Sequence, residues 1–120
     1  MKDDKIYIQH ILDCIDKINL YCKNKRKKDF LKDDMLKDAV IRNIEIIGEA
    51  SKKISIEFKT IYNVVPWKDI SGMRDKIVHN YIGIDYVIVW EVIKKDLPLL
   101  KNVLTKSLCN IMYDKSKSDK

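Results

Sequence analysis

Glycine and proline are scarce in this chain, with only three glycines and two prolines among 120 residues. A β-sandwich or barrel of this length needs many tight turns, and tight turns draw on these two residue types. The scarcity therefore predicts long helices joined by few connections. It also excludes glycine-rich phosphate cradles, because the sequence holds neither a P-loop nor a GxGxxG motif.

Apolar residues recur every three or four positions in the first half of the chain, which indicates amphipathic helices. A first helix is predicted over residues 4–24, with an apolar face of Ile8, Ile11, Leu12, Ile15, Ile18 and Cys22. A second is predicted over residues 33–57, with a face of Leu36, Val40, Ile44, Ile47, Ala50 or Ser51, and Ile54, which Ile41 and Ile46 make wide. Asp33 or Asp34 can cap the second helix, and Gly48 within it suggests a close helix crossing.

The second half predicts two more helices. Pro66 favours a helix entry, so a third, shorter helix is expected over residues 67–81, after a connection over 58–66 and before Gly83. Asp85 can cap a fourth helix, whose apolar positions are Val87, Ile88, Trp90, Val92, Ile93, Leu97, Leu100 and Leu104. Pro98 should kink or split that helix near Leu97. Residues 82–90 are rich in β-branched side chains, but a lone strand would have no partner, so no strand is predicted.

The predicted fold is therefore all-α: an antiparallel four-helix bundle with a kink or a short extra helix near the C-terminus. We expect one domain over residues 1–112 and a disordered basic tail over 113–120. No stretch approaches the roughly 18 consecutive apolar residues of a membrane-spanning helix. The first residues are too acidic for a signal peptide, which suggests a cytoplasmic protein.

The cysteines and the net charge give weaker constraints. Cys14, Cys22 and Cys109 are odd in number and lack CxxC spacing, so neither a disulfide framework nor a zinc site is expected. The net charge of +6 is compatible with a polyanionic partner. Part of that charge lies in a short basic run, formed by Lys23, Lys25, Arg26, Lys27 and Lys28. This run is either a weak RNA-binding candidate or, as is more common for a run taken alone, a solvated loop.

A polar island interrupts the third predicted helix around one of the two histidines, His79. Its other members are Arg74, Asp75, Asn80 and Tyr81. Arginine, histidine and tyrosine together can bind a phosphate, move a proton near neutral pH and supply a hydroxyl group. The alternative is a surface arginine and a histidine near a helix end. The second histidine, His10, lies beside the apolar face of the first helix and is given no role.

Helix geometry limits how the island could work. Arg74 and His79 are five residues apart, or about 140° around an ideal helix, so their side chains would diverge. Three explanations are open: the helix is distorted, long side chains converge at its edge, or a second copy of the chain completes the site.

The segment Arg74-Asp-Lys-Ile-Val-His79-Asn-Tyr81 resembles the RxxxxHxY motif of the HepT-like toxins, a family of the HEPN superfamily of small α-helical proteins. The surrounding landmarks are similar too. Residues 42–50 resemble the family's central helix, residues 66–67 and 72–74 its approach to the motif, and Trp90 and residues 96–98 its last helix. The similarity covers roughly residues 5–105. Where this chain has Asp75, family members often carry asparagine.

The resemblance implies a four-helix HEPN bundle that forms a homodimer, with the motifs of both chains lining one cleft. It implies the toxin of a type VII-like toxin–antitoxin pair, acting as a metal-independent endoribonuclease without a cofactor. Arg74 and His79 would be catalytic, with Asp75 and Asn80 in support. The usual partner is an MntA-type nucleotidyltransferase antitoxin, which would neutralise the toxin by adding AMP to Tyr81.

The residues suit that chemistry. RNA supplies its own nucleophile, the 2′-OH, and a neutral His79 could accept its proton. Arg74 could hold the scissile phosphate. The expected products are a 2′,3′-cyclic phosphate and a 5′-OH, and His79 of the second protomer is a candidate for protonating the leaving oxygen. The alternative is a non-catalytic helical subunit that binds a nucleotidyltransferase or a nucleotide and cleaves nothing.

Overall fold

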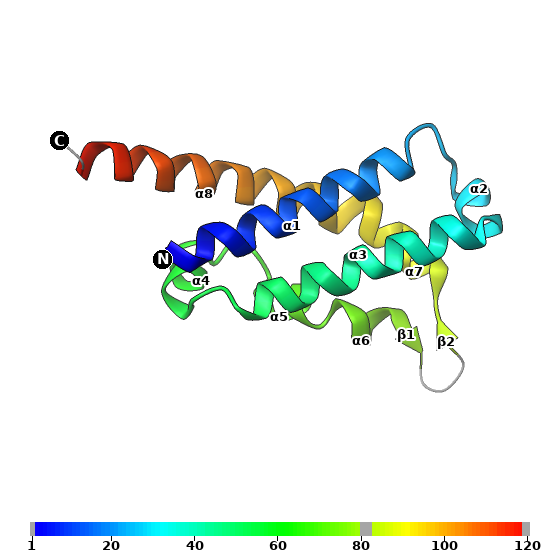
Figure 1. Cartoon of the computed structure of the whole chain (residues 1–120). Helices are drawn as coiled ribbons and strands as arrows, with labels where there is room; N and C mark the ends of the chain where they lie inside the picture. The colour runs from blue at the N-terminus through cyan, green and yellow to red at the C-terminus, as the bar shows by residue number, and fades with distance from the viewer. Residues whose placement is uncertain (1, 80–82, 119–120) are drawn as a thin grey trace.

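Three long helical segments form the body of the molecule (Figure 1). They are α1 (Lys2–Tyr21), α3 (Asp34–Lys52) and the continuous run of α7 (Tyr86–Glu91), η1 (Val92–Asp96) and α8 (Leu97–Ser118). The structure is a computed structural model that describes residues 2–79 and 83–118; it describes the side chains of these residues except 2, 78, 79 and 111–118.

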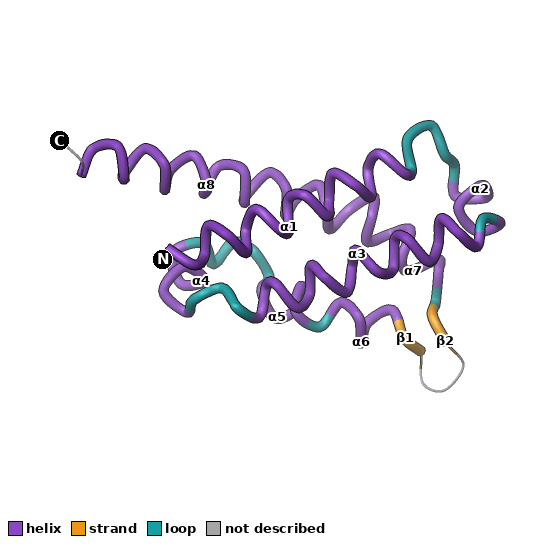
Figure 2. Tube along the Cα trace, in the orientation of Figure 1, coloured by secondary structure: helices purple, strands orange, loops and turns teal. Residues whose placement is uncertain are grey.

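Short elements connect and cover these segments (Figure 2). The short helices are α2 (Lys27–Lys32), α4 (Ile56–Ile61), α5 (Trp67–Ser71) and α6 (Met73–Ile77). Two strands of two residues each, β1 (Val78–His79) and β2 (Gly83–Ile84), pair antiparallel. Helix α1 packs against α3 and α8, while α5 and α6 pack against α3. The all-α bundle predicted from the sequence is therefore confirmed, with α5 and α6 in the place of one continuous helix.

The predicted apolar faces of the first two helices form the core. The residues predicted for those faces are buried, including both Ala50 and Ser51, except Ile46, which is 37% exposed. Fully buried aromatic rings extend this core at the two ends of the bundle: Phe30 lies beside Tyr86 and Trp90, and Phe58 beside Tyr62 and Trp67.

Local signals placed several helix ends correctly. The Asp33 carboxylate accepts a hydrogen bond from the Leu36 N–H at 3.0 Å, which caps α3. The Asp85 carboxylate accepts from the N–H groups of the second and third residues of α7 at 3.1 and 3.3 Å. The close crossing expected at Gly48 is present, since a Cβ there would lie 3.5 Å from the Ser71 carbonyl oxygen of α5.

The kink expected at Pro98 takes the form of a π-helical turn just before it. Pro98 has no N–H, and its ring crowds the carbonyl four residues earlier in an α-helix. The π-helical turn η1 relieves this steric crowding. In it the Leu97 N–H donates to the Val92 carbonyl, five residues earlier. The helix therefore bends without ending.

The third predicted helix is wrong at residue 72 and at residues 78 and 79. Instead of running over residues 67–81, the chain breaks at Gly72 between α5 and α6, and α6 ends at Ile77. The expectation that no strand forms is also wrong. Gly83 and Ile84, at the start of the β-branched segment, pair with His79 and Val78. β-branched side chains around the motif favour this extended backbone over a helix.

Three other boundaries differ from the prediction. The second helix ends at Lys52 rather than 57, and the predicted connection over 58–66 begins inside α4. The cause is a contact with α1: the Asp4 carboxylate, 2% exposed, accepts from the N–H and the Oγ–H of Ser55 at 2.7 and 2.6 Å. Residues 113–118 are helical where a disordered tail was expected, since no glycine or proline follows Pro98 to end α8. Among the described residues, no helix combines the length and apolarity that crossing a bilayer requires.

Candidate active site

Arg74 lies on α6 with an exposed side chain. Its Nε lies 3.8 Å from Oε1 of Glu45 on α3, and the two side chains are 69% and 47% exposed. Exposed ion pairs of this kind contribute only about 0–1 kcal/mol, because water screens them and two long side chains must be ordered. The guanidinium is thus oriented by Glu45 yet remains available to a stronger anionic partner such as a phosphate.

A surface hollow of about 200 Å³ lies where α5 and α6 meet α3. Its lining residues are Glu45, Gly48, Glu49, Lys52, Ser71, Arg74 and Asp75. The structure therefore brings Asp75, predicted as a supporting residue, to the same hollow as Arg74. The hollow carries both signs of charge, and Lys52 pairs with Glu49 across 3.2 Å.

His79 lies on the β1–β2 hairpin rather than on the helix that carries Arg74. Its backbone pairs with Gly83, and the Asp85 N–H donates to the Ile77 carbonyl at 2.7 Å at the base of the hairpin. Helix α6 ends two residues before His79, so the angle of about 140° expected on an ideal helix does not describe this segment. The His79 side chain, Asn80 and Tyr81 lie outside the described residues, so their predicted roles stay predictions.

The predicted RNA-binding run begins in the connection between α1 and α2, with Lys23, Lys25 and Arg26. It continues into the first turn of α2, with Lys27 and Lys28. All five of its basic residues are exposed. Arg26 is partly engaged, because its Nε lies 3.6 Å from Oδ2 of Asp29 and its N–H donates to the same carboxylate. The backbone N–H of Arg26, more than its charge, lowers the pKa of Asp29. α2 and the hairpin lie at the same end of the molecule (Figure 1).

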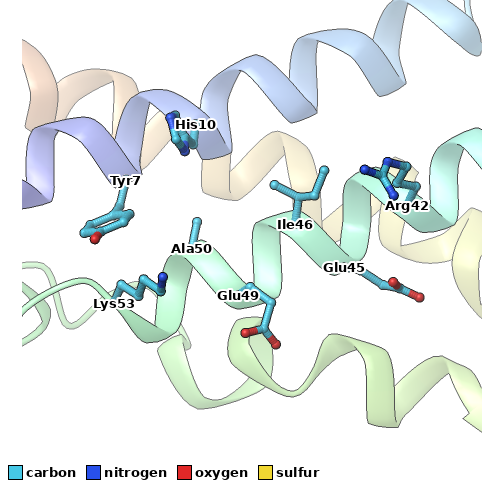
Figure 3. Close-up of a pocket in the computed structure, with 8 residues that line it drawn as sticks. All are labelled: Tyr7, His10, Arg42, Glu45, Ile46, Glu49, Ala50 and Lys53. Carbon is cyan, nitrogen blue, oxygen red and sulfur yellow. The ribbon is translucent and has the colours of Figure 1, made fainter.

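A larger hollow of about 370 Å³ lies between α1 and α3 (Figure 3). Tyr7 and His10 contribute to it from α1, and Arg42, Glu45, Ile46, Glu49, Ala50 and Lys53 from α3. Sequence reasoning gave His10 no role and considered only the buried face of α3. The signal that could have identified this hollow is the row of charges on the opposite face of α3.

The cysteines contribute no reactive centre to these hollows. Cys14 and Cys22 are buried, as predicted, and burial raises the pKa of both thiols. In the part of the chain that the structure describes, no three histidine, cysteine or acidic side chains gather where they could hold a metal ion.

The sequence matches the family model described as "Ribonuclease HepT-like" over residues 11–107. A Methanocaldococcus jannaschii protein named as a gamma-glutamylcyclotransferase and candidate RNase is 47% identical over 99% of this chain, which spans only 53% of that protein. A candidate RNase of Caldanaerobacter subterraneus is 42% identical over 90% of this chain and 96% of its own length. A "probable ribonuclease HepT" of Thermococcus cleftensis is 39% identical over 88% of this chain and 96% of its own length. No solved structure matches significantly.

Proposed function

Because this chain belongs to the HepT-like ribonuclease family, we propose that it is a metal-independent endoribonuclease with Arg74 and His79 as its catalytic residues. The observation that supports this best is the position of Arg74. Its exposed guanidinium borders an open hollow. Helix α6, which carries Arg74, leads directly into the hairpin that bears His79. An arginine paired with an exposed carboxylate can exchange that partner for an RNA phosphate at small cost.

In the proposed reaction the RNA 2′-OH attacks the adjacent phosphorus while neutral His79 accepts its proton. The bond from phosphorus to the 5′-oxygen breaks, which gives a 2′,3′-cyclic phosphate and a 5′-OH. Arg74 holds the phosphate and offsets the charge that develops on its oxygens. The 5′-oxygen takes its proton from a protonated His79 of a second protomer, which becomes neutral. Single-stranded loops suit this chemistry, since their nucleotides can be splayed out of the stack.

The proposed biological role is that of a toxin in a type VII-like toxin–antitoxin pair, acting as a homodimer. An MntA-type nucleotidyltransferase would transfer AMP from ATP to the Tyr81 oxygen, with release of pyrophosphate and the phenolic proton. The added phosphate would bring a negative charge that competes with the RNA phosphate for Arg74. The basic run from Lys23 to Lys28 would add phosphate contacts that strengthen binding without reading sequence.

Substitution of the two catalytic residues tests the enzyme proposal. Arg74→Ala and His79→Ala should each abolish RNA cleavage by the purified protein, and EDTA should not inhibit the unsubstituted chain. Arg74→Lys keeps the charge but loses the two-pronged phosphate contact, so it should retain little activity. His10→Ala is the matched control, since His10 is the other histidine and is exposed. Cleavage that survives His79→Ala, or that needs a divalent metal, would contradict the mechanism; no cleavage by the unsubstituted chain would favour the non-catalytic alternative.

Intact-mass measurement tests the regulatory proposal. After co-expression with an MntA-type nucleotidyltransferase, the chain should gain the mass of AMP, and Tyr81→Phe should prevent that gain. Tyr62→Phe serves as the control, because Tyr62 is half-buried against Phe58 in the core. A neutralised toxin with unmodified Tyr81 would contradict this part of the proposal.

A further inference from the structure

The outward face of α3 carries a row of charges that we call the α3 ridge, made up of Asp38, Arg42, Glu45, Glu49 and Lys53, with Ile46 at its middle. Steps of three and four residues keep all of these on one side of the helix. All five charged side chains are exposed, and Ile46 is 37% exposed. Figure 3 shows the ridge from Arg42 to Lys53 running along α3.

The order of charges makes the ridge complementary to a reversed copy of itself. If α3 of a second chain lies antiparallel, with the two-fold axis between positions 45 and 46, Arg42 faces Glu49 of the other copy. Asp38 then faces Lys53. Symmetry makes each pairing twice, so four opposite-charge pairs form across one isologous contact.

Neighbouring registers lack this property. Moving the axis half a turn toward the N-terminus of α3 pairs Arg42 with Glu45 but sets Asp38 against Glu49. Moving it half a turn the other way sets Arg42 against Lys53. Since like charges in contact cost several kcal/mol at an interface, the charge order selects one register.

The surface on both sides of the ridge suits a facing copy. The ridge stands between the hollow of about 370 Å³ against α1 and that of about 200 Å³ against α5 and α6, and Glu45 and Glu49 line both. In the antiparallel arrangement each hollow faces its own counterpart, and Ile46 supplies apolar contact near the axis.

We propose that the α3 ridge is the surface on which a second copy of this chain docks, antiparallel, with Arg42 against Glu49 and Asp38 against Lys53 of the other copy. The inference rests on the homodimer of the proposed function and assigns its interface. Glu45 lies at the axis, and its ion pair with Arg74 offsets the repulsion between the two Glu45 carboxylates. Both Arg74 side chains then lie near the axis, where the two smaller hollows join into one shared site.

Complementary charge reversals test the register directly. Arg42→Glu alone puts acids on both sides of two contacts, and Glu49→Arg alone puts arginines there. Each variant should dissociate about tenfold more readily or worse, measured by analytical ultracentrifugation. Mixing the two variants should restore a dimer containing one chain of each, because every contact is then opposite in charge. The double variant should also dimerise with itself.

Lys106→Glu on α8 is the matched control, since it reverses one exposed charge outside the ridge and should leave dimerisation unchanged. RNA cleavage should follow the dimer: low for each single variant and regained on mixing. A dimer indifferent to both reversals would overturn the ridge interface while leaving the enzyme proposal intact. A monomeric, RNA-cleaving wild-type chain would overturn the homodimer itself, and a wild-type dimer that cleaves nothing would overturn only the enzyme proposal.

Discussion

Two regions of the molecule differ in what determines their secondary structure. One is formed by helices α1 and α3, and the other is the segment from Lys53 to Asp85. In α1 and α3 nearly every turn is set by apolar residues three and four apart, and each of those residues is buried. Among its described residues, the segment from Lys53 to Asp85 holds three short helices and two short strands. Single contacts between particular residues set where these short elements begin and end. One such contact is that of Ser55 with Asp4, and another is that of Asp85 with Ile77.

The difference separates stability from chemistry. The long helices gain their stability from a repeated row of buried apolar side chains. Substitutions on that face are poorly tolerated, whereas the outer face is free to carry charged residues. In the segment that bears Arg74 and His79, Met73 and Ile77 are the buried side chains among the described residues 73–77. We therefore expect substitutions in the two regions to differ in the size and origin of their effects.

The largest effect on stability is expected from Ile8→Ala in α1. Ile8 is 0% exposed, and truncation of such a side chain costs about 2–5 kcal/mol through lost burial and the cavity left behind. The free energy of unfolding, measured by urea denaturation, should fall by that amount.

Ile6→Ala provides the control on the same helix, because Ile6 is 55% exposed and its truncation should change stability by about 0.5 kcal/mol or less. Equal losses in the two variants would show that the face of α1 has been assigned incorrectly.

The same contrast explains how much of the fold the sequence could predict. The faces of α1 and α3 and the caps Asp33 and Asp85 depend on residues close in sequence, so pattern alone identified them. The start of α4 has a local signal in the Ser55 cap on the Phe58 N–H, but no local pattern shows that Asp4, some fifty residues earlier, also binds Ser55. The end of α6 was missed because Gly83 suggested a helix terminator, whereas its φ of +111° serves the hairpin.

The candidate site shows a similar division. The polar island and the resemblance to the RxxxxHxY motif singled out Arg74 and its neighbour Asp75, and the structure brings both to one hollow. Glu45, which orients Arg74, was not singled out, because a lone exposed acid on a helix gives no signal until α6 packs beside it. Side chains that meet only through packing are invisible to periodicity.

A smaller but distinct loss is expected from Ser55→Ala, which tests the contact-built region. The change removes the cap on the Phe58 N–H and leaves one Asp4 carboxylate oxygen without its hydroxyl donor. Together these should cost about 1–3 kcal/mol in urea denaturation.

Thr60→Ala is the matched control, because its hydroxyl donates to a carbonyl on the exposed side of α4 and its loss should cost about 0.5 kcal/mol or less. Combining Ser55→Ala with Asp4→Ala should cost less than the sum of the single changes, since both break one network. Strict additivity would mean that the contact between α1 and α4 does not couple the two sites.

Alanine substitutions at two glycines, one in each region, should have effects on stability that differ in sign. Gly83→Ala places a Cβ at a φ of +111°, where a side chain is strained whatever the surrounding space, so it should destabilise by about 1–3 kcal/mol. Gly48→Ala places a Cβ 3.5 Å from the Ser71 carbonyl oxygen, an ordinary van der Waals contact, inside a helix that prefers alanine. It should leave stability unchanged or raise it by up to about 1 kcal/mol.

Urea denaturation of the two variants tests both expectations. A neutral Gly83→Ala would contradict the hairpin, and a destabilising Gly48→Ala would mean that α3 and α5 cross more tightly than the distance of 3.5 Å indicates. RNA cleavage should fall further in Gly83→Ala than in Gly48→Ala, because the strain acts on the backbone that carries His79.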